Sequence, residues 1–122
     1  MEIKKLDVNF SVCQVVDFSQ VNFEDPFLFI GKTDEEKSVV CSTESVPQNS
    51  IACESGWKGF RIQGVLDFSL VGILAKISSL LAENSISIYA ISTYNTDYIL
   101  VKETVYEKAL KLLEEDGYTI IE

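Results

Sequence analysis

Two polar stretches in the second half of the chain carry groups that could bind a small charged molecule. Residues 65–74 combine a strand-like apolar run, a short polar loop and the start of a helical pattern. The first turn of a helix has backbone N–H groups without intrahelical partners, and such groups attract anions. Residues 91–100 predict two strands joined by a tight polar turn that ends in Asp97. Placed side by side, the stretches would offer N–H donors for a carboxylate and an aspartate for an ammonium. These are the two charged groups of a free amino acid.

The elements that must position these stretches follow a regular order from Trp57 onward. Apolar residues alternate with polar ones where strands are expected and recur every three or four positions where helices are expected. The order is strand, helix, strand, strand, helix, strand, at residues 57–65, 70–83, 86–92, 98–102, 104–116 and 118–121. It is the order of the ferredoxin-like βαββαβ unit, in which both helices cover one face of a four-stranded antiparallel sheet. We therefore predict an α+β fold for this half.

The helix ends also carry sequence signals. Asp67 or Ser69 is predicted to cap the first helix, and Asn84 is predicted to end it. Residues 104–107 have the form of a capping box at the start of the second helix, and Gly117 follows its last turn.

The first 56 residues show little helical periodicity and several turn markers. Residues 6–16 form an extended pattern, and residues 27–33 and 38–41 predict two strands joined by a charged loop. Residues 44–56 lack a clear period, so we expect them to be irregular apart from a short strand around 50–53. The chain is thus predicted to divide into a strand-rich unit at 1–56 and a ferredoxin-like domain at 57–122.

The charge of the chain is strongly acidic, at −9, and Arg61 is its only arginine. Nucleic acids and anionic membranes attract clustered positive charge, so we expect neither as a partner. No apolar run approaches the roughly 20 residues of a membrane-spanning helix. The first residues lack the apolar segment of a secretory signal, and we therefore place the protein in the cytoplasm.

Residues for catalysis or metal binding are scarce. Histidine is absent, which removes the commonest general base and the commonest zinc ligand. Cys13, Cys41 and Cys53 are an odd number without CxxC spacing, which favours reduced thiols in a core. No motif for nucleotide binding or hydrolysis is present. We expect no enzyme, no cofactor and no metal; an enzyme with one of these thiolates as nucleophile is the minor alternative.

Residues 67–75, with the sequence DFSLVGILA, and residues 86–101, with the sequence ISIYAISTYNTDYILV, together resemble the ACT domain. More narrowly, they are similar to small two-ACT proteins related to aspartate kinase regulatory regions and to arginine-sensing proteins of animal cells. The resemblance is specific over residues 57–121. It is weaker over the first half, where it rests on residues 33–41 and 54–57.

The resemblance implies an N-terminal half that is a degenerate, strand-rich ACT-like unit packed beside the second. It also implies a homodimer or larger homo-oligomer, and an amino acid bound at an ACT interface. In relatives that bind arginine, the loop opening the helix and a Ser-Thr-aromatic-x-x-Asp segment contact the ligand. The matching positions here are Asp67, Phe68, Ser69, Leu70 and Gly72, followed by Ser92, Thr93, Tyr94 and Asp97.

Several of these positions also have a structural interpretation. Asp67 before a helix is a cap that contributes about 1 kcal/mol. Gly72 within a helix costs about 1 kcal/mol against alanine. Two interpretations explain a glycine at this position: the close approach of a ligand or of another strand, or the packing of the helix. Asp97 is also explained by its place in a turn, where aspartate is common. If both aspartates bind ligand, they favour a cationic amino acid such as lysine or arginine.

We expect the whole protein to function as a non-catalytic regulatory module, and this expectation has one main alternative. This is a dimerisation or protein-interaction module without a ligand. Its interface pocket would be filled by side chains such as Tyr94 or Phe68.

Overall fold

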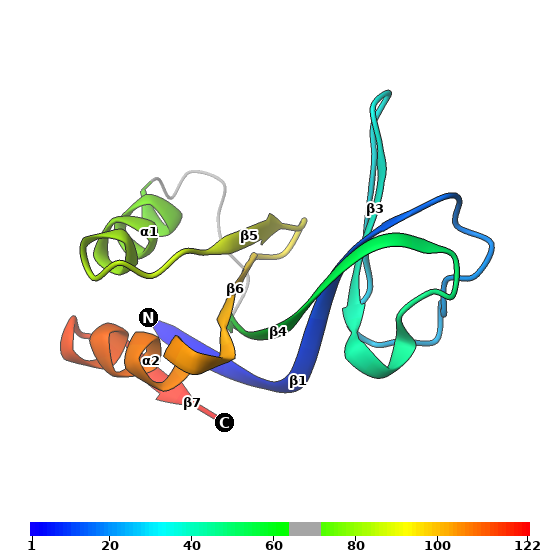
Figure 1. Ribbon diagram of the computed structural model, residues 1–122. Coiled ribbons are helices and arrows are strands. Elements are labelled where there is room, and N and C mark those ends of the chain that lie inside the picture. The colour runs from blue at the N-terminus through cyan, green and yellow to red at the C-terminus, as the bar shows by residue number, and fades with distance from the viewer. Residues whose placement is uncertain (64–71) are drawn as a thin grey trace. The chain divides into compact units, whose positions relative to one another are not determined.

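The computed structural model describes residues 1–63 and 72–122. The chain forms two compact units, whose elements are drawn in Figure 1. Unit 1 contains Met1–Asp7 and Lys58–Glu122, and unit 2 contains Val8–Trp57. Strands β1 (Glu2–Val15) and β4 (Ser50–Ile62) therefore contribute residues to both units. The domain limits 1–56 and 57–122 stay a prediction.

Unit 1 has the order of elements predicted from Trp57 onward. After β4 come a helix, two strands, a second helix and a further strand. These are α1 (Ile73–Glu83), β5 (Tyr89–Ser92), β6 (Asp97–Lys102), α2 (Tyr106–Glu115) and β7 (Thr119–Ile121). A short 3-10 helix, η2 (Glu103–Val105), precedes α2. The predicted alternation of strands and helices is thus confirmed. Among the described residues, neither helix is long and apolar enough to span a bilayer.

The sheet of unit 1 departs from the predicted four-stranded antiparallel arrangement at one edge. Its strand order is β7-β1-β4-β6-β5, so the start of β1 lies between β4 and β7. Residues 2–4 pair in parallel with β7, while β5 and β6 pair antiparallel. Figure 1 shows β7 beside the labelled N-terminal end of β1. The prediction was wrong here because it built the sheet only from residues after Trp57.

Both helices pack on one face of this sheet. A single core cluster joins side chains of α1 and α2 with side chains of β1, β4 and β6. Alternate residues of each strand enter it, as expected when one face of a strand is buried. Burying one such side chain contributes about 1.5–3 kcal/mol. The buried members are Ile3, Phe60, Ile62, Ile77, Leu81, Ile86, Ile99, Val101, Tyr106, Ala109, Leu110 and Leu113.

The starts of both helices differ from the predicted capping. The N-cap of α1 is Gly72, and it makes no side-chain cap bond. The prediction of Asp67 or Ser69 as the cap is therefore wrong. The capping box at residues 104–107 is also wrong, because η2 occupies the first of these positions and Val105 is the N-cap of α2.

The ends of the helices agree better with the sequence. Asn84 is the C-cap of α1, although the residue with left-handed backbone is the following Ser85, with a φ of 61°. Gly117 follows α2 with a φ of 101°, and the N–H of Tyr118 donates to the carbonyl of Leu113 at 3.1 Å. A glycine with positive φ after a helix is the expected stop.

Unit 2 contains no α-helix in residues 8–57, all of which the structure describes. Its strand order is β2-β3-β1-β4, with β2 (Phe29–Lys32) and β3 (Lys37–Ser42) forming the predicted hairpin. A 3-10 helix, η1 (Thr43–Ser45), follows β3. The short strand predicted around residues 50–53 is confirmed, because β4 begins at Ser50, but the irregular segment predicted up to residue 56 is wrong, because β4 continues to Ile62. Residues 51–55 are exposed, so no alternating hydrophobic pattern marks the length of this strand.

Unit 2 contains a buried apolar cluster and a buried carboxylate. Val15, Val39 and Cys41 form the cluster, and Asp25, which carries the carboxylate, is 8% exposed. The carboxylate of Asp25 accepts the N–H and the hydroxyl of Ser42 at 2.9 and 3.0 Å, and the N–H of Phe27 at 3.0 Å. These three bonds satisfy a charged group that would otherwise be costly to bury.

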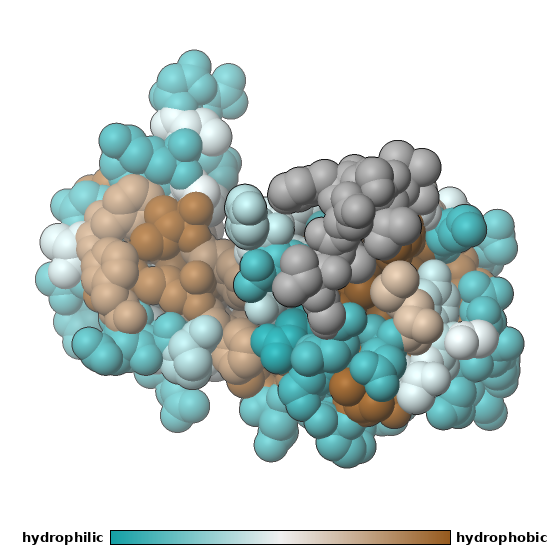
Figure 2. Space-filling model, turned by 180° about the vertical axis from the view of Figure 1, so that it is seen from behind, coloured by the Kyte–Doolittle hydropathy of each residue, from teal (hydrophilic) through white to brown (hydrophobic). Residues whose placement is uncertain are grey.

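Unit 2 also leaves large apolar side chains on its surface. Val16, Phe23 and Ile51 are all exposed. Figure 2 shows an area of apolar residues at the left of the face that it draws. A sheet without a covering layer of helices cannot bury as much apolar surface as a helix-covered one.

The hairpin of unit 2 has the same plan as the hairpin of unit 1. β2 and β5 each have four residues, β3 and β6 each have six, and η1 and η2 each have three. Both connecting turns begin with a threonine, Thr33 or Thr93, whose N–H donates to the carbonyl three positions later. Few side chains are identical in the two hairpins, so sequence identity does not show their common plan; in the sequence, only the resemblance at residues 33–41 and 54–57 pointed to a second ACT-like unit.

Candidate ligand-binding site

The turn between β5 and β6 is closed by Thr93 and Thr96. The N–H and the hydroxyl of Thr93 both donate to the carbonyl of Thr96, each at 2.9 Å. The N–H of Thr96 donates back to Oγ1 of Thr93 at 3.4 Å. These bonds fix the turn, and they bring the strand ends on either side of it together.

Ser92 and Asp97 face each other at these strand ends. They are opposite one another in the hairpin, and Oγ of Ser92 donates to Oδ1 of Asp97 at 2.6 Å. Ile99 and Val101, further along β6, pack in the core beneath the helices. Because side chains alternate along a strand, Asp97 lies on the same face as the helices. A carboxylate that accepts one hydroxyl retains acceptor positions for an ammonium or guanidinium group.

The side chain of Thr96 connects the hairpin to the end of β4. Its hydroxyl is buried, with the residue 7% exposed, and it donates to the carbonyl of Ile62 at 2.7 Å. Ile62 is the last residue of β4, so this bond holds the turn against the strand that leads toward α1. Thr96 was not among the predicted site residues, because threonine is common in polar turns for local reasons.

Gly72 lies directly before α1 with a φ of 83°. The prediction that placed it within the helix is wrong. An added Cβ would meet no atom within 4 Å, so the left-handed backbone accounts for the glycine. The carbonyl of Gly72 accepts the N–H of Lys76 at 2.8 Å, which is the first hydrogen bond of the helix. The N–H groups that precede Lys76 in the first turn of α1 therefore have no intrahelical partners.

The structure brings part of the predicted site together. Ser92, Thr93 and Asp97 form one turn, and Tyr94 at its tip is 83% exposed. Gly72 stands at the start of α1. The other predicted contacts, Asp67, Phe68, Ser69 and Leu70, lie outside the described residues. Ligand contact at all nine positions stays a prediction.

Arg61 lies on the opposite face of the sheet from Asp97. Its neighbours Phe60 and Ile62 point into the core under the helices, so Arg61 points to the other side. Its Nε donates to Oε1 of Gln63 at 3.1 Å, and its guanidinium carbon is 5.9 Å from the ring centre of Tyr98. The only arginine of the chain therefore does not face Asp97.

Two cavities of unit 1 are lined by other residues. One, of about 620 Å³, lies beside the second half of α1 and includes Ser78, Ser85 and Ser87. The other, of about 300 Å³, includes Lys5, Lys58 and Tyr106.

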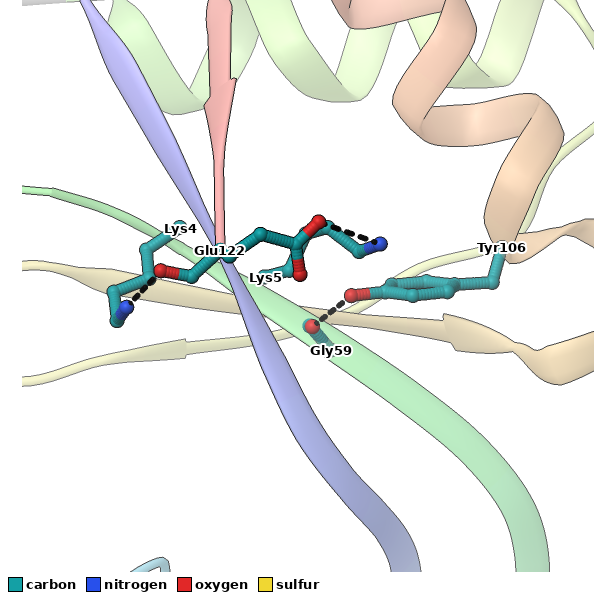
Figure 3. Close-up of polar contacts among 5 residues, drawn as sticks. All are labelled: Lys4, Lys5, Gly59, Tyr106 and Glu122. Carbon is teal, nitrogen blue, oxygen red and sulfur yellow. Dashed lines mark hydrogen bonds and ion pairs between the residues drawn. The ribbon is translucent and has the colours of Figure 1, made fainter.

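Figure 3 shows the polar contacts beside the second cavity. The hydroxyl of Tyr106 donates to the carbonyl of Gly59 at 2.7 Å, and Nζ of Lys5 lies 3.5 Å from Oε1 of Glu122. In the described part of the chain, neither cavity has a predicted site residue in its lining.

Cys13 and Cys41 are buried thiols whose surroundings oppose ionisation. Burial, followed by the hydrogen bond and charge of Cys53, raises the pKa of Cys13 to about 12. Burial, followed by the charge of Asp25, raises the pKa of Cys41 to about 11. Nucleophilic cysteines have lowered pKa values, so these two positions speak against the thiolate-enzyme alternative.

The fold of unit 1 agrees with the sequence comparison. The family model for the ACT domain matches residues 52–115. This chain belongs to the ACT domain family. A comparison with curated protein sequences finds no match.

Solved structures extend the similarity over nearly the whole chain. A protein from Agobacterium tumefaciens, solved by X-ray crystallography, has 28% identity and a TM-score of 0.87, over 98% of this chain and 91% of that one. A protein of unknown function from Vibrio cholerae, described as a possible transport protein, has 23% identity and a TM-score of 0.70, over 93% of this chain and 88% of that one. The ligand-free regulatory subunit of aspartate kinase from Thermus thermophilus has 10% identity and a TM-score of 0.65, over 94% and 96%. The last two show a shared fold.

Proposed function

We propose that this chain is a non-catalytic regulatory module that binds a free amino acid. The proposed site joins the connection from β4 to α1, with Asp67, Phe68, Ser69, Leu70 and Gly72, to the turn with Ser92, Thr93, Tyr94 and Asp97. The bond from Thr96 to Ile62 is the observation that carries this proposal, because it holds the turn at the strand end where that connection begins.

The chemistry of the proposed site suits a zwitterion. N–H groups at the start of α1 would donate hydrogen bonds to the ligand carboxylate, whose negative charge the positive end of a helix favours. Asp97 would accept the ammonium, and Ser92 holds its carboxylate in place. A second aspartate, Asp67, would favour a cationic side chain, so lysine and arginine are the first ligands to test.

We further propose that unit 2 is a degenerate ACT-like repeat and that the protein assembles as a homodimer in the cytoplasm. The matching lengths of the strands and turns in the two hairpins support the repeat. Family membership supports assembly, since an ACT interface places a helix start opposite a neighbouring unit. Analytical ultracentrifugation tests the assembly: a sedimentation mass of one chain at all concentrations contradicts it.

Thermal-shift titration of the full chain with each common amino acid tests the binding proposal. A ligand at a hundredfold excess over its dissociation constant should stabilise the folded state by about 2.7 kcal/mol. Asp97→Asn should abolish the response. Asp34→Asn, in the corresponding exposed turn of unit 2, removes the same charge and should leave the response intact. A flat response of the folded wild-type chain to every amino acid refutes the proposal.

A second candidate is an interaction module without a ligand. The exposed tyrosine at the tip of the turn, Tyr94, favours it, because aromatic residues are enriched at protein interfaces. Under this alternative, Tyr94→Ala weakens self-association or partner binding, and no amino acid changes the melting temperature.

A further inference from the structure

Cys13 and Cys53 face each other on two neighbouring strands of unit 2. The thiol of Cys13 donates to Sγ of Cys53, and the two sulfur atoms are 3.1 Å apart. Their strands, β1 and β4, are adjacent in the sheet. A disulfide bond is about 2.05 Å long, so the sulfur atoms need to approach by about 1 Å. Both residues are free thiols in this structure.

The two thiols differ in their access to solvent. Cys13 is buried, whereas Cys53 lies in the exposed part of β4. A small oxidant in solution therefore reaches Cys53 first, and Cys13 is held beside it as the second thiol. An accessible cysteine next to a resolving cysteine is the arrangement found in thiols that are oxidised reversibly.

We propose that Cys13 and Cys53 form a site of reversible oxidation, at which a hydroperoxide converts the two thiols into an intrachain disulfide. The sulfur of Cys53 attacks one peroxide oxygen, the O–O bond breaks, and a sulfenic acid and one water (or alcohol) form. The sulfur of Cys13 then attacks the sulfenyl sulfur, the S–O bond breaks, and a second water leaves with the proton of Cys13. The cysteines lose two electrons and the peroxide gains them. A dithiol reductant reverses the change.

The environment of Cys13 supports this order of events. Its pKa is raised to about 12, chiefly by burial, so Cys13 stays protonated near neutral pH and does not react with the oxidant itself. Part of the increase comes from the hydrogen bond and the charge of Cys53. The buried thiol of Cys13 therefore acts only in the second step, after Cys53 has been oxidised.

Cys41 is the natural control for this pair. It is buried on β3, on the other side of β1 from β4. Unlike Cys53, it is shielded from an oxidant in solution. Cys41→Ser should therefore leave the disulfide between Cys13 and Cys53 unchanged, whereas Cys53→Ser should abolish oxidation of Cys13.

The experiment treats the reduced full-length chain with hydrogen peroxide and blocks the remaining thiols with an alkylating reagent. Peptide mass spectrometry without reduction then identifies the bonded cysteines. The expected result is one peptide pair joining Cys13 to Cys53, which disappears after dithiothreitol. This pair should also appear in Cys41→Ser and be absent from Cys53→Ser.

Three outcomes overturn the proposal. One is a persistent sulfenic or sulfinic acid at Cys53 with Cys13 still alkylated. The second is a pairing of Cys13 with Cys41, and the third is a disulfide between two chains through Cys53. The melting temperature is an independent readout in which oxidation should stabilise the wild type and Cys41→Ser, but not Cys53→Ser.

Discussion

Replacing Tyr106 by phenylalanine tests how α2 is attached to the sheet of unit 1. Tyr106 is 3% exposed, and its hydroxyl donates to the carbonyl of Gly59 on β4. Phenylalanine keeps the buried ring and removes only the donor. The buried carbonyl of Gly59 then lacks this partner, and an unsatisfied buried group costs about 1–3 kcal/mol. We expect Tyr106→Phe to lower the free energy of unfolding by about 2 kcal/mol at neutral pH.

The same substitution should change the response to alkaline pH. Burial raises the pKa of Tyr106 from its ordinary value of 10.0 to about 12. Between these values the unfolded chain loses the phenolic proton while the folded chain keeps it, so stability falls as the pH rises. A change of two pKa units corresponds to at most about 3 kcal/mol. Tyr106→Phe lacks this contribution and should lose less stability over the same pH range.

Urea unfolding, followed by circular dichroism at neutral pH and at steps above pH 10, measures both effects. Buried thiols also favour their protonated form in the folded chain, but they contribute equally to wild type and variant. Tyr94→Phe is the matched control, because it removes an exposed hydroxyl and should change stability by less than about 0.5 kcal/mol. If Tyr106→Phe unfolds like the wild type at every pH, the bond to Gly59 does not stabilise unit 1.

Three other substitutions test particular contacts, each by urea unfolding. Thr96→Val removes the donor to the Ile62 carbonyl and should cost about 1–3 kcal/mol; amide hydrogen exchange in the turn should rise, and unchanged exchange would contradict the role of this bond. Asp25→Asn replaces one acceptor of the Ser42 bonds by a donor and should also cost about 1–3 kcal/mol; a wild-type midpoint would show that these bonds contribute nothing. Gly72→Ala forces a side chain into left-handed backbone and should cost about 1 kcal/mol. The control Gly31→Ala adds a Cβ in ordinary contact, so equal losses in both variants would refute the backbone argument.

The parts of the fold that were predictable are those with a buried periodic face. α1 and β6 each place alternate or helically spaced apolar residues in one core, and that pattern is visible in the sequence. The first half of β4 is a strand with exposed residues 51–55, so it carries no such pattern. The pairing of residues 2–4 with β7 joins distant parts of the chain, and no local signal marks it.

The candidate site was predictable to a similar extent. A polar turn ending in Asp97 is visible in the sequence, and the structure places Ser92 opposite that residue. The buried bond of Thr96 depends on the position of β4, which only the folded sheet provides. The cap of α1 was mistaken because Gly72 with positive φ can start a helix without a side-chain acceptor.

The place of β1 beside β7 also sets an order for folding during synthesis. The strands of unit 2 come from residues that are made early and lie within a short span, so they can pair while the ribosome is still translating. Residues 2–4 of β1, in contrast, can pair with β7 only after residues 119–121 have been synthesised. A nascent chain halted before β7 would therefore present a bare strand edge, which is a site for pairing with other chains.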